Sequence, residues 1–447
     1  MRLIILLILS IVFIVFTTSK LKWHPVLALL GAAFGFGMLS GTMSLGSVVV
    51  AVNTGFGNTL GYIGIVILAG TIIGKFLEKS GGAYKLAEGI LKIVGKRNVP
   101  LSMSITGYFV SIPVFCDSAF IILSPLVKAL SRQAKIPLAI GIIALSMGLN
   151  VTHSIIPPTP GPVAGAALLN ADLGKVIMLG IPVSIVGLII GWLFAVKVAS
   201  KFHLVPDSTE EEQPIPEQSN RGPSAVKSIV PILLPIILII LRSISELPSL
   251  PFGEGTASTL ISFIGQPVVA LFIGVLFSFL LPQKLTREML SPSGWLGQAV
   301  VASASIIIIT GCGGAFGKVL QDSGIGEVIQ NNLSGAKSLG ILLPIILAAV
   351  LKTAQGSGTV SIITSASLMA PLLPSLGLDE PMARALVVVA IGSGAMIFSH
   401  ANDSYFWVVT QFSNMDVKTG YRLQSTGTAI MGVAAAVTAW LLSVVIL

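Results

Sequence analysis

The sequence predicts an all-α polytopic membrane protein built from two inverted repeats, each with a re-entrant hairpin and a broken transmembrane helix. Three observations predict this fold. Hydrophobic residues make up 54% of the 447 residues, only 10% are charged and the mean hydropathy is +0.95, which soluble domains do not approach. A glycine-containing motif recurs at a fixed offset in the two halves. Each half also carries polar or proline-rich breaks inside apolar stretches, a pattern typical of transporter binding sites.

The first pair of breaks predicts two re-entrant hairpins, at 99–133 and 339–375. Their tips are Pro113-Val-Phe-Cys-Asp-Ser118 and Gln355-Gly-Ser-Gly-Thr359, each between apolar arms. Lipid cannot bond a freed N–H or C=O, so such a break at membrane depth must line a cavity inside protein. Small residues let a ligand approach the backbone, and hydroxyls and amides match a polyhydroxylated molecule.

A second pair of breaks predicts broken helices at 138–170 and 383–412. In the first, four prolines between Pro157 and Pro162 cannot continue a helix. Polar residues from Asn150 to Ser154 would end one half-helix, and the free N–H groups that begin the next could hold a carboxylate. A proline kink in a purely structural helix is the alternative.

The remaining spans follow from runs of about 20 apolar residues. They are predicted at 2–19, 24–40, 60–78, 176–199, 228–246, 260–281, 301–320 and 426–446, with interfacial helices at 44–59 and 83–97. The predicted organisation is 1–59 (N-terminal spans and interfacial helix), 60–199 (first repeat), 200–227 (hydrophilic linker), 228–300 (connecting spans) and 301–447 (second repeat). In this threading most of the 26 lysines and arginines face the cytoplasm, while Lys352 is assigned to the outer side.

The repeat is visible as aligned residues. Gly70, Gly74-Lys75, Leu77 and Ser80-Gly81 lie over Gly313, Gly317-Lys318, Leu320 and Ser323-Gly324 at an offset of 243. The first copy starts on a span that runs inward and the second on one that runs outward. Inverted repeats permit alternating access to a site at the membrane midplane.

Two places could carry proton chemistry. His400 and Asp403 are expected to share one helix face within an apolar segment and to be partners, because ionisable groups in a membrane are costly and by default functional. Asp117 is expected to be protonated when substrate is bound or to couple a cation, with a helix cap as an equal alternative. A metal at His400 and Asp403 is disfavoured, because no third carboxylate or cysteine is near.

These observations predict a site with no catalytic residue, no metal and no cofactor. The predicted proton-coupling residues are Asp117, His400 and Asp403. The predicted substrate-binding residues are Asp117, Ser118, Asn150, Thr152, His153, Ser154, Gln355, Gly356, Ser357, Gly358, Thr359, Ser399 and Asn402. The net charge of +8 does not indicate nucleic acid, because the basic residues are scattered over short loops.

The stretches Gly74-Lys75, Pro113 to Asp117, Gln355 to Thr359 and Ser399-His-Ala-Asn-Asp-Ser-Tyr-Phe-Trp407 together resemble the gluconate:proton symporter (gluconate permease) family. The resemblance covers nearly the whole chain. It implies a multi-pass carrier of the ion transporter superfamily in the bacterial inner membrane. It also implies import of gluconate or another small hydroxy or amino acid with protons.

The leading prediction is therefore a secondary transporter of a small hydroxy-monocarboxylate that works by proton symport. Its partners would be a small anionic substrate, protons and the lipid bilayer, and a homodimeric assembly is left open. Sodium coupling is the alternative within the same class. A membrane-embedded enzyme is the alternative of another class, disfavoured because no catalytic motif occurs, and a channel is a weaker third.

Overall fold

The computed structural model describes residues 2–95, 98–202, 204, 222–246, 251–253, 255–332 and 339–447, and every regular element in them is helical. The predicted all-α fold is confirmed. Most of the predicted linker at 200–227 lies outside the described residues.

The first half of the chain forms a series of helices and short turns. They are α1 (Arg2–Val15), η1 (Phe16–Lys20), α2 (Pro25–Ser40), α3 (Leu45–Lys79), α4 (Gly82–Val94), α5 (Val99–Val110), α6 (Cys116–Gln133), α7 (Leu138–Ile155), α8 (Pro160–Leu168), α9 (Leu173–Lys197) and η3 (Ala199–Lys201).

The second half begins with a connecting group and then repeats the order of the first. Its elements are α11 (Ala225–Ser245), α12 (Thr256–Ile264), α13 (Pro267–Ser278), α14 (Trp295–Asp322), α15 (Ile325–Asn332), α17 (Leu342–Gln355), α18 (Gly358–Met369), η4 (Ala370–Leu372), α19 (Leu373–Leu376), α20 (Pro381–Ala395), α21 (Ser404–Phe412), α22 (Val417–Gly420), η5 (Tyr421–Ser425) and α23 (Thr426–Ile446).

The helical order confirms the repeat and its register. Helices α4, α5 and α7 begin 243 residues before α15, α17 and α20, respectively. Helix α3, which precedes α4, corresponds to α14, which precedes α15. Helices α8 and α9 correspond in the same way to α21 and the α22–α23 segment.

The corresponding helices α3 and α14 pack antiparallel, as inverted repeats require. Gly55, near the start of α3, lies against Gly314, near the end of α14. At the other end of the contact the rings of Phe76 and Trp295 are 5.3 Å apart. A Cβ on Gly55 would come within 2.4 Å of the Gly314 carbonyl oxygen, so the small residues allow close packing of the two backbones.

Each predicted hairpin is a pair of helices joined by a short turn. The first tip lies between α5 and α6, and the second lies between α17 and α18. At the second tip Gly356 has a φ of +76°, a conformation that favours glycine. Ser357 then caps α18 by accepting a bond from the Val360 N–H at 3.3 Å. The two arms are tied by Ser361 Oγ, which donates to the Ala348 carbonyl at 2.7 Å.

The broken helices lie inside the protein. The best apolar window of the stretch Leu138–Leu168, which contains α7, its break and α8, is 94% buried. The corresponding window of Val417–Ile446, at the end of the chain, is only 28% buried. Backbone groups freed at the α7–α8 break are therefore surrounded by protein and not by lipid, which is the condition for tolerating a break at membrane depth.

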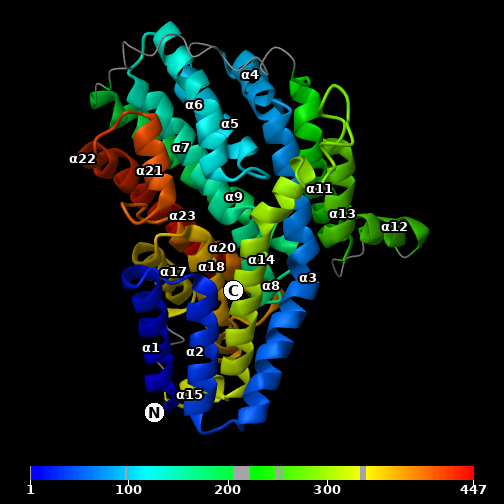
Figure 1. The fold of residues 1–447 in the computed structure, drawn as a ribbon, viewed down its shortest axis with the longest axis vertical. Helices are drawn as coiled ribbons and strands as arrows, with labels where there is room; N and C mark the ends of the chain where they lie inside the picture. The colour runs from blue at the N-terminus through cyan, green and yellow to red at the C-terminus, as the bar shows by residue number, and fades with distance from the viewer. Residues whose placement is uncertain are drawn as a thin grey trace.

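Among the described residues, six helical stretches have the length and hydropathy to cross a membrane, or eight if two bent pairs each count as one span. Helices α1 and α2, both predicted spans, are shorter apolar helices. They pack against each other on the lower left of Figure 1. The amphipathic α4 matches the predicted interfacial helix at 83–97, and its position at the membrane surface stays a prediction.

Two predicted boundaries are wrong. Residues 44–59 do not form a separate interfacial helix, because Leu45–Lys79 is one helix, α3, with a bend of 43°. Its small residues near Gly55 contact α14. The predicted span at 260–281 is two helices, α12 and α13, bent by 68°. Helix α12 projects sideways from the bundle (Figure 1).

Candidate functional site

Four helix N-termini meet in two pairs, and each pair joins the two repeats. In one pair, the first turn of α6 lies against the start of α21, where Ser404 Oγ donates to Asp117 Oδ2 at 3.2 Å. In the other, the start of α8 lies against the start of α18, and a Cβ on Gly161 would sit 3.6 Å from the Thr359 Cα. Helix N-termini carry partial positive charge and free N–H donors. The arrangement therefore offers an environment suited to a carboxylate.

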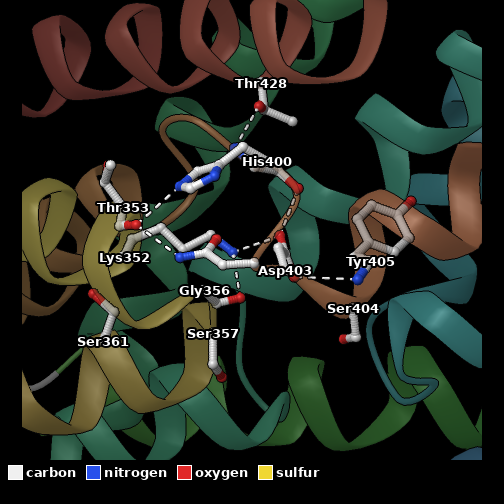
Figure 2. Close-up of polar contacts among 12 residues, drawn as sticks. Lys352, Thr353, Gly356, Ser357, Ser361, His400, Asp403, Ser404, Tyr405 and Thr428 are labelled. Carbon is white, nitrogen blue, oxygen red and sulfur yellow. Dashed lines mark hydrogen bonds and ion pairs between the residues drawn. The ribbon is translucent and has the colours of Figure 1, made fainter. Parts of the chain in front are cut away.

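A buried ion pair joins the second hairpin to the second broken helix. Lys352, in the last turn of α17, places its Nζ 2.6 Å from Asp403 Oδ2. The two side chains are only 6% and 8% exposed. The same ammonium donates to the carbonyl of Gly356 at the hairpin tip, at 3.2 Å. Figure 2 shows this lysine reaching from the hairpin to Asp403.

Asp403 receives two further hydrogen bonds. Ser399 Oγ donates to Oδ2 at 2.5 Å, and the Tyr405 N–H donates to Oδ1 at 3.1 Å, which makes Asp403 the N-cap of α21. Three donors therefore surround one buried carboxylate, and one of them is an ammonium.

The expected pairing of His400 with Asp403 is wrong. The segment between α20 and α21 is not helical, so the two residues do not share a helix face. His400 Nε2 instead donates to the Thr353 carbonyl at 2.9 Å, while Asp403 pairs with Lys352. The helical spacing failed as a guide because the helix ends before it reaches these residues. Lys352, which counts toward the outer side in the charge-based topology, has its side chain buried in this pair.

The break between α20 and α21 is anchored to the second hairpin through backbone carbonyls. Asn402 Nδ2 donates to the carbonyls of Thr353 and Ala354, at 2.9 and 3.2 Å. A Cβ on Gly356 would meet the Asn402 carbonyl oxygen at 2.2 Å. The hairpin tip and the break therefore fit against each other with no room for a larger residue at position 356.

Several buried polar atoms near these breaks have no hydrogen-bond partner within the described protein. They are Asn150 Nδ2, Thr152 Oγ1, His153 Nδ1, Gln355 Nε2, Gln355 Oε1 and Asn402 Oδ1. Buried polar groups are ordinarily satisfied, and each exception calls for an explanation such as water, an ion or a ligand. The set contains both donors and acceptors, which is what a hydroxylated ligand requires.

The predicted site residues all lie at helix ends or in the breaks between helices. Asp117 and Ser118 are in the first turn of α6, and the predicted residues from Asn150 to Ser154 are in the last turns of α7. Gln355 ends α17, Gly356 and Ser357 form the turn, and Gly358 and Thr359 begin α18. Ser399, His400, Asn402 and Asp403 lie between α20 and α21. Asp117 is not the N-cap of α6, because Phe115 occupies that position.

Sequence reasoning missed two groups of residues. Lys352 was treated as a topology signal, although a lysine three residues before a hairpin tip in an apolar arm is a signal of function. A second group forms a hydrogen-bonded network that includes Tyr405, in the first turn of α21 after Asp403. Ser146 Oγ donates to Gln424 Oε1 at 2.8 Å and contacts Tyr405 Oη at 3.1 Å, and Tyr405 Oη donates to the Ser146 carbonyl at 3.2 Å.

A separate polar cavity of about 550 Å³ lies at the other end of α8, between α3, α14, the end of α18 and the start of α20. Two cations line it, each held by a carboxylate. Lys318 pairs with Asp322 at 2.8 Å, and Arg384 pairs with Asp379 at 2.7 Å. None of the predicted site residues lines this cavity.

Comparisons with known proteins agree with this architecture. The family model described as GntP family permease matches residues 1–445. A gluconate permease of Pseudomonas aeruginosa is 33% identical over 98% of this chain and 96% of its own length. The D-serine transporter DsdX of Escherichia coli K12 is 32% identical over 98% of both chains.

Solved structures share the fold at lower identity. The YdaH transporter of Alcanivorax borkumensis superposes with a TM-score of 0.68 at 16% identity, over 95% of this chain and 99% of that one. MtrF of Neisseria gonorrhoeae, described as one of a class of antimetabolite efflux pumps, gives the same TM-score and identity over 95% of this chain and 96% of its own.

Proposed function

We propose that this chain, which belongs to the GntP permease family, is a secondary active transporter that imports a small hydroxy-monocarboxylate by proton symport. Gluconate or a related sugar acid or glycerate-like acid is the substrate class, and the bacterial inner membrane is the location. Similar proteins named gluconate permease and D-serine transporter support a small acid that carries both a carboxylate and hydroxyl or amino groups.

One observation supports the substrate class: unpartnered polar atoms lie at the helix ends and breaks of the candidate site, which also holds the buried ammonium of Lys352. Gln355 has both a free donor and a free acceptor, Asn150 has a free donor, and Asn402 has a free acceptor. A polyhydroxylated chain supplies the complementary groups. Lys352 and the helix N-termini suit the carboxylate end of the same molecule. We propose that the predicted substrate-binding residues, together with Lys352, form this site.

The inverted repeats support alternating access as the transport mechanism. The α6–α21 and α8–α18 contacts each join one repeat to the other. A relative movement of the repeats would therefore open the site to one face and close it to the other without rebuilding its walls. Alternating access of this kind needs no covalent chemistry.

The test is uptake into proteoliposomes that contain the purified protein. An inward pH gradient without sodium should drive accumulation of labelled gluconate, D-glycerate or 3-hydroxybutyrate. The substrate recovered from the lumen should be chemically unchanged. Accumulation that requires sodium would replace proton coupling by sodium coupling, and a chemically altered product would indicate an enzyme.

A further inference from the structure

We propose that Lys352 is the residue that binds the substrate carboxylate, and that its release from Asp403 creates the proton site, so that one proton crosses with each monocarboxylate. This inference rests on the proposed function and deepens it, since it names the pair of residues that couples substrate to proton. Neither the family match nor the similar proteins assign a role to this pair.

The geometry of the resting pair supplies the first step. Lys352 Nζ lies 2.6 Å from Oδ2 of Asp403, and Ser399 Oγ and the Tyr405 N–H also donate to this carboxylate, so donors occupy both of its oxygens. A proton can bind only after the ammonium has moved to another anion. The substrate carboxylate is such an anion, and it would take the place of Asp403 on Lys352 Nζ.

Charge conservation supplies the second step. Before binding, the Lys352–Asp403 pair has no net charge. A bound monocarboxylate adds one negative charge, and a proton on Asp403 removes it again. The proton enters from the side that is open to substrate, forms an O–H bond on Asp403, and leaves on the opposite side when Lys352 returns to the carboxylate.

The cost of an unpaired buried charge couples substrate binding to proton binding in this exchange. An unpaired charge in the interior of a membrane protein is expensive. The empty carrier and the carrier loaded with both substrate and proton leave the charge of this site unchanged. The carrier loaded with substrate alone adds an uncompensated negative charge. Only the first two states are expected to change access from one face of the membrane to the other.

The Lys352–Asp403 pair lies where the second hairpin meets α21, so the exchange of partners can affect both elements. Lys352 also donates to Gly356 at the hairpin tip, and Asp403 caps α21. Movement of the ammonium therefore alters contacts at the tip of the second hairpin and at the start of α21. Both belong to the second repeat, and α21 contacts α6 of the first repeat through Ser404 and Asp117.

Other titratable groups face the pair and are competing proton sites. They are Asp117 and Cys116 of α6, His153 of α7, His400 in the break and Tyr405 of α21. Asp117 is the closest rival, because among the described residues it has no cation within ion-pair distance and accepts bonds only from Ser404 and Cys116.

The experiment measures uptake and charge movement in proteoliposomes with gluconate as the probe. Wild-type uptake should follow a pH gradient and should not respond to a membrane potential set with potassium and valinomycin. Asp403→Asn should still exchange gluconate across the membrane, because its substrate-loaded site has no net charge. It should lose net accumulation driven by the pH gradient, because its empty site would keep an unpaired ammonium. Lys352→Gln should weaken gluconate binding about tenfold or more.

The controls separate this inference from the proposed function and from misfolding. Lys85→Gln breaks a lysine–glutamate pair within α4, away from the site, and should behave as wild type. The double variant Lys352→Gln/Asp403→Asn leaves no unpaired charge, so it should remain folded and fail to couple. Wild-type protein that accumulates none of the hydroxy acids under a pH gradient would refute the proposed function.

Three outcomes in a proton-coupled wild type would overturn the inference alone. One is normal pH-driven accumulation by Asp403→Asn. Another is loss of coupling in Asp117→Asn or His400→Gln while Asp403→Asn retains it. The third applies even if every variant at the pair fails to fold: wild-type uptake that carries net charge would contradict the exchange of one proton for one carboxylate.

Discussion

Two kinds of buried polar residue meet in this protein, one turn apart on the same helix. Ser146 of α7 makes its hydrogen bonds within the protein, to Gln424 and Tyr405. Asn150, four residues later, leaves its amide nitrogen without a partner. A satisfied group stabilises the folded state, whereas an unsatisfied one is costly unless something else binds to it. The two residues should therefore respond to substitution in opposite ways.

We predict that Asn150→Ala lowers substrate affinity and leaves thermal stability unchanged or higher. Loss of one neutral hydrogen bond to substrate should cost about 0.5–1.5 kcal/mol, or roughly 2- to 10-fold in affinity. Ser146→Ala is the matched control, and it should lower the melting temperature because it removes the hydroxyl that donates to Gln424 Oε1, while Tyr405 keeps its bond to the Ser146 carbonyl. Binding isotherms and melting curves of both variants test this, and a lower melting temperature for Asn150→Ala would make that residue structural.

Gly356 is the residue whose identity the backbone constrains most clearly at the site. It combines a φ of +76° with a Cβ position only 2.2 Å from the Asn402 carbonyl oxygen. We predict that Gly356→Ala lowers the melting temperature and abolishes uptake. Gly377→Ala is the control, since Gly377 has a similar φ of +72° but open space around it. It should cost only the conformational term of about 1–2 kcal/mol, and equal effects of the two variants would show that contact with Asn402 does not matter.

The helix breaks of the candidate site could be predicted from the sequence where they depend on local chemistry. Prolines and glycines end helices by their own backbone properties, so the polar residues beside them could be assigned to breaks. The pairing of Lys352 with Asp403 could not be predicted in this way, because 51 residues separate them and only the docking of the hairpin against the break brings them together. The same docking draws His400 to Thr353 and away from Asp403.

At the scale of helices, sequence patterns predicted where a helix breaks better than where a helix continues through small and polar residues. The glycines and polar residues between Asn53 and Asn58 suggested a short interfacial helix, yet they lie within α3, where Gly55 and Thr59 contact Gly314 of α14. Small residues serve both roles, and only the partner helix distinguishes them. Where prolines or a glycine ended a helix, the residues themselves identified the helix end, and no knowledge of a packing helix was needed.

Two aligned glycines test how much hairpin packing differs between the repeats. A Cβ on Gly74 of α3 would lie 2.0 Å from the Pro113 carbonyl oxygen at the first hairpin tip. A Cβ on Gly317, the equivalent residue of α14, would lie 3.3 Å from the Ser367 carbonyl oxygen. We predict that Gly74→Ala displaces the first hairpin, at a cost of about 1–3 kcal/mol, while Gly317→Ala is close to neutral. Melting curves and initial uptake rates measure both, and a neutral Gly74→Ala would contradict the packing.

For the whole molecule, the repeats share a backbone plan but not their charges. Thr159 and Asp403 occupy the same N-cap position, before α8 and α21. Phe109 stands in the first repeat where Lys352 stands in the second, at the offset of 243. The ion pair therefore belongs to the second repeat alone, and the first repeat contributes Asp117 and the unpartnered groups of α7. In the proposed mechanism, the symmetry of the repeats would provide alternating access, and the asymmetric ion pair would provide the coupling.

The inverted topology gives the last prediction, which uses two equivalent asparagines. Asn170, after α8, and Asn414, after α21, are both exposed and have φ values of +50° and +53°. In the inverted arrangement these matching turns lie on opposite faces of the membrane. The positive-inside rule places Asn414, close to Lys418 and Arg422, in the cytoplasm and Asn170 outside.

Single cysteines at positions 170 and 414, in a background with Cys116 and Cys312 replaced by alanine, should show on which face of the membrane each turn lies. A membrane-impermeant maleimide applied to intact cells should label Asn170→Cys, and it should label Asn414→Cys only after the cells are opened. Each substitution removes an asparagine that tolerates a left-handed turn, so uptake by both variants serves as the control for folding. Labelling of both cysteines from one side would mean that the repeats are parallel. The alternating-access mechanism would then lose the symmetry on which it depends.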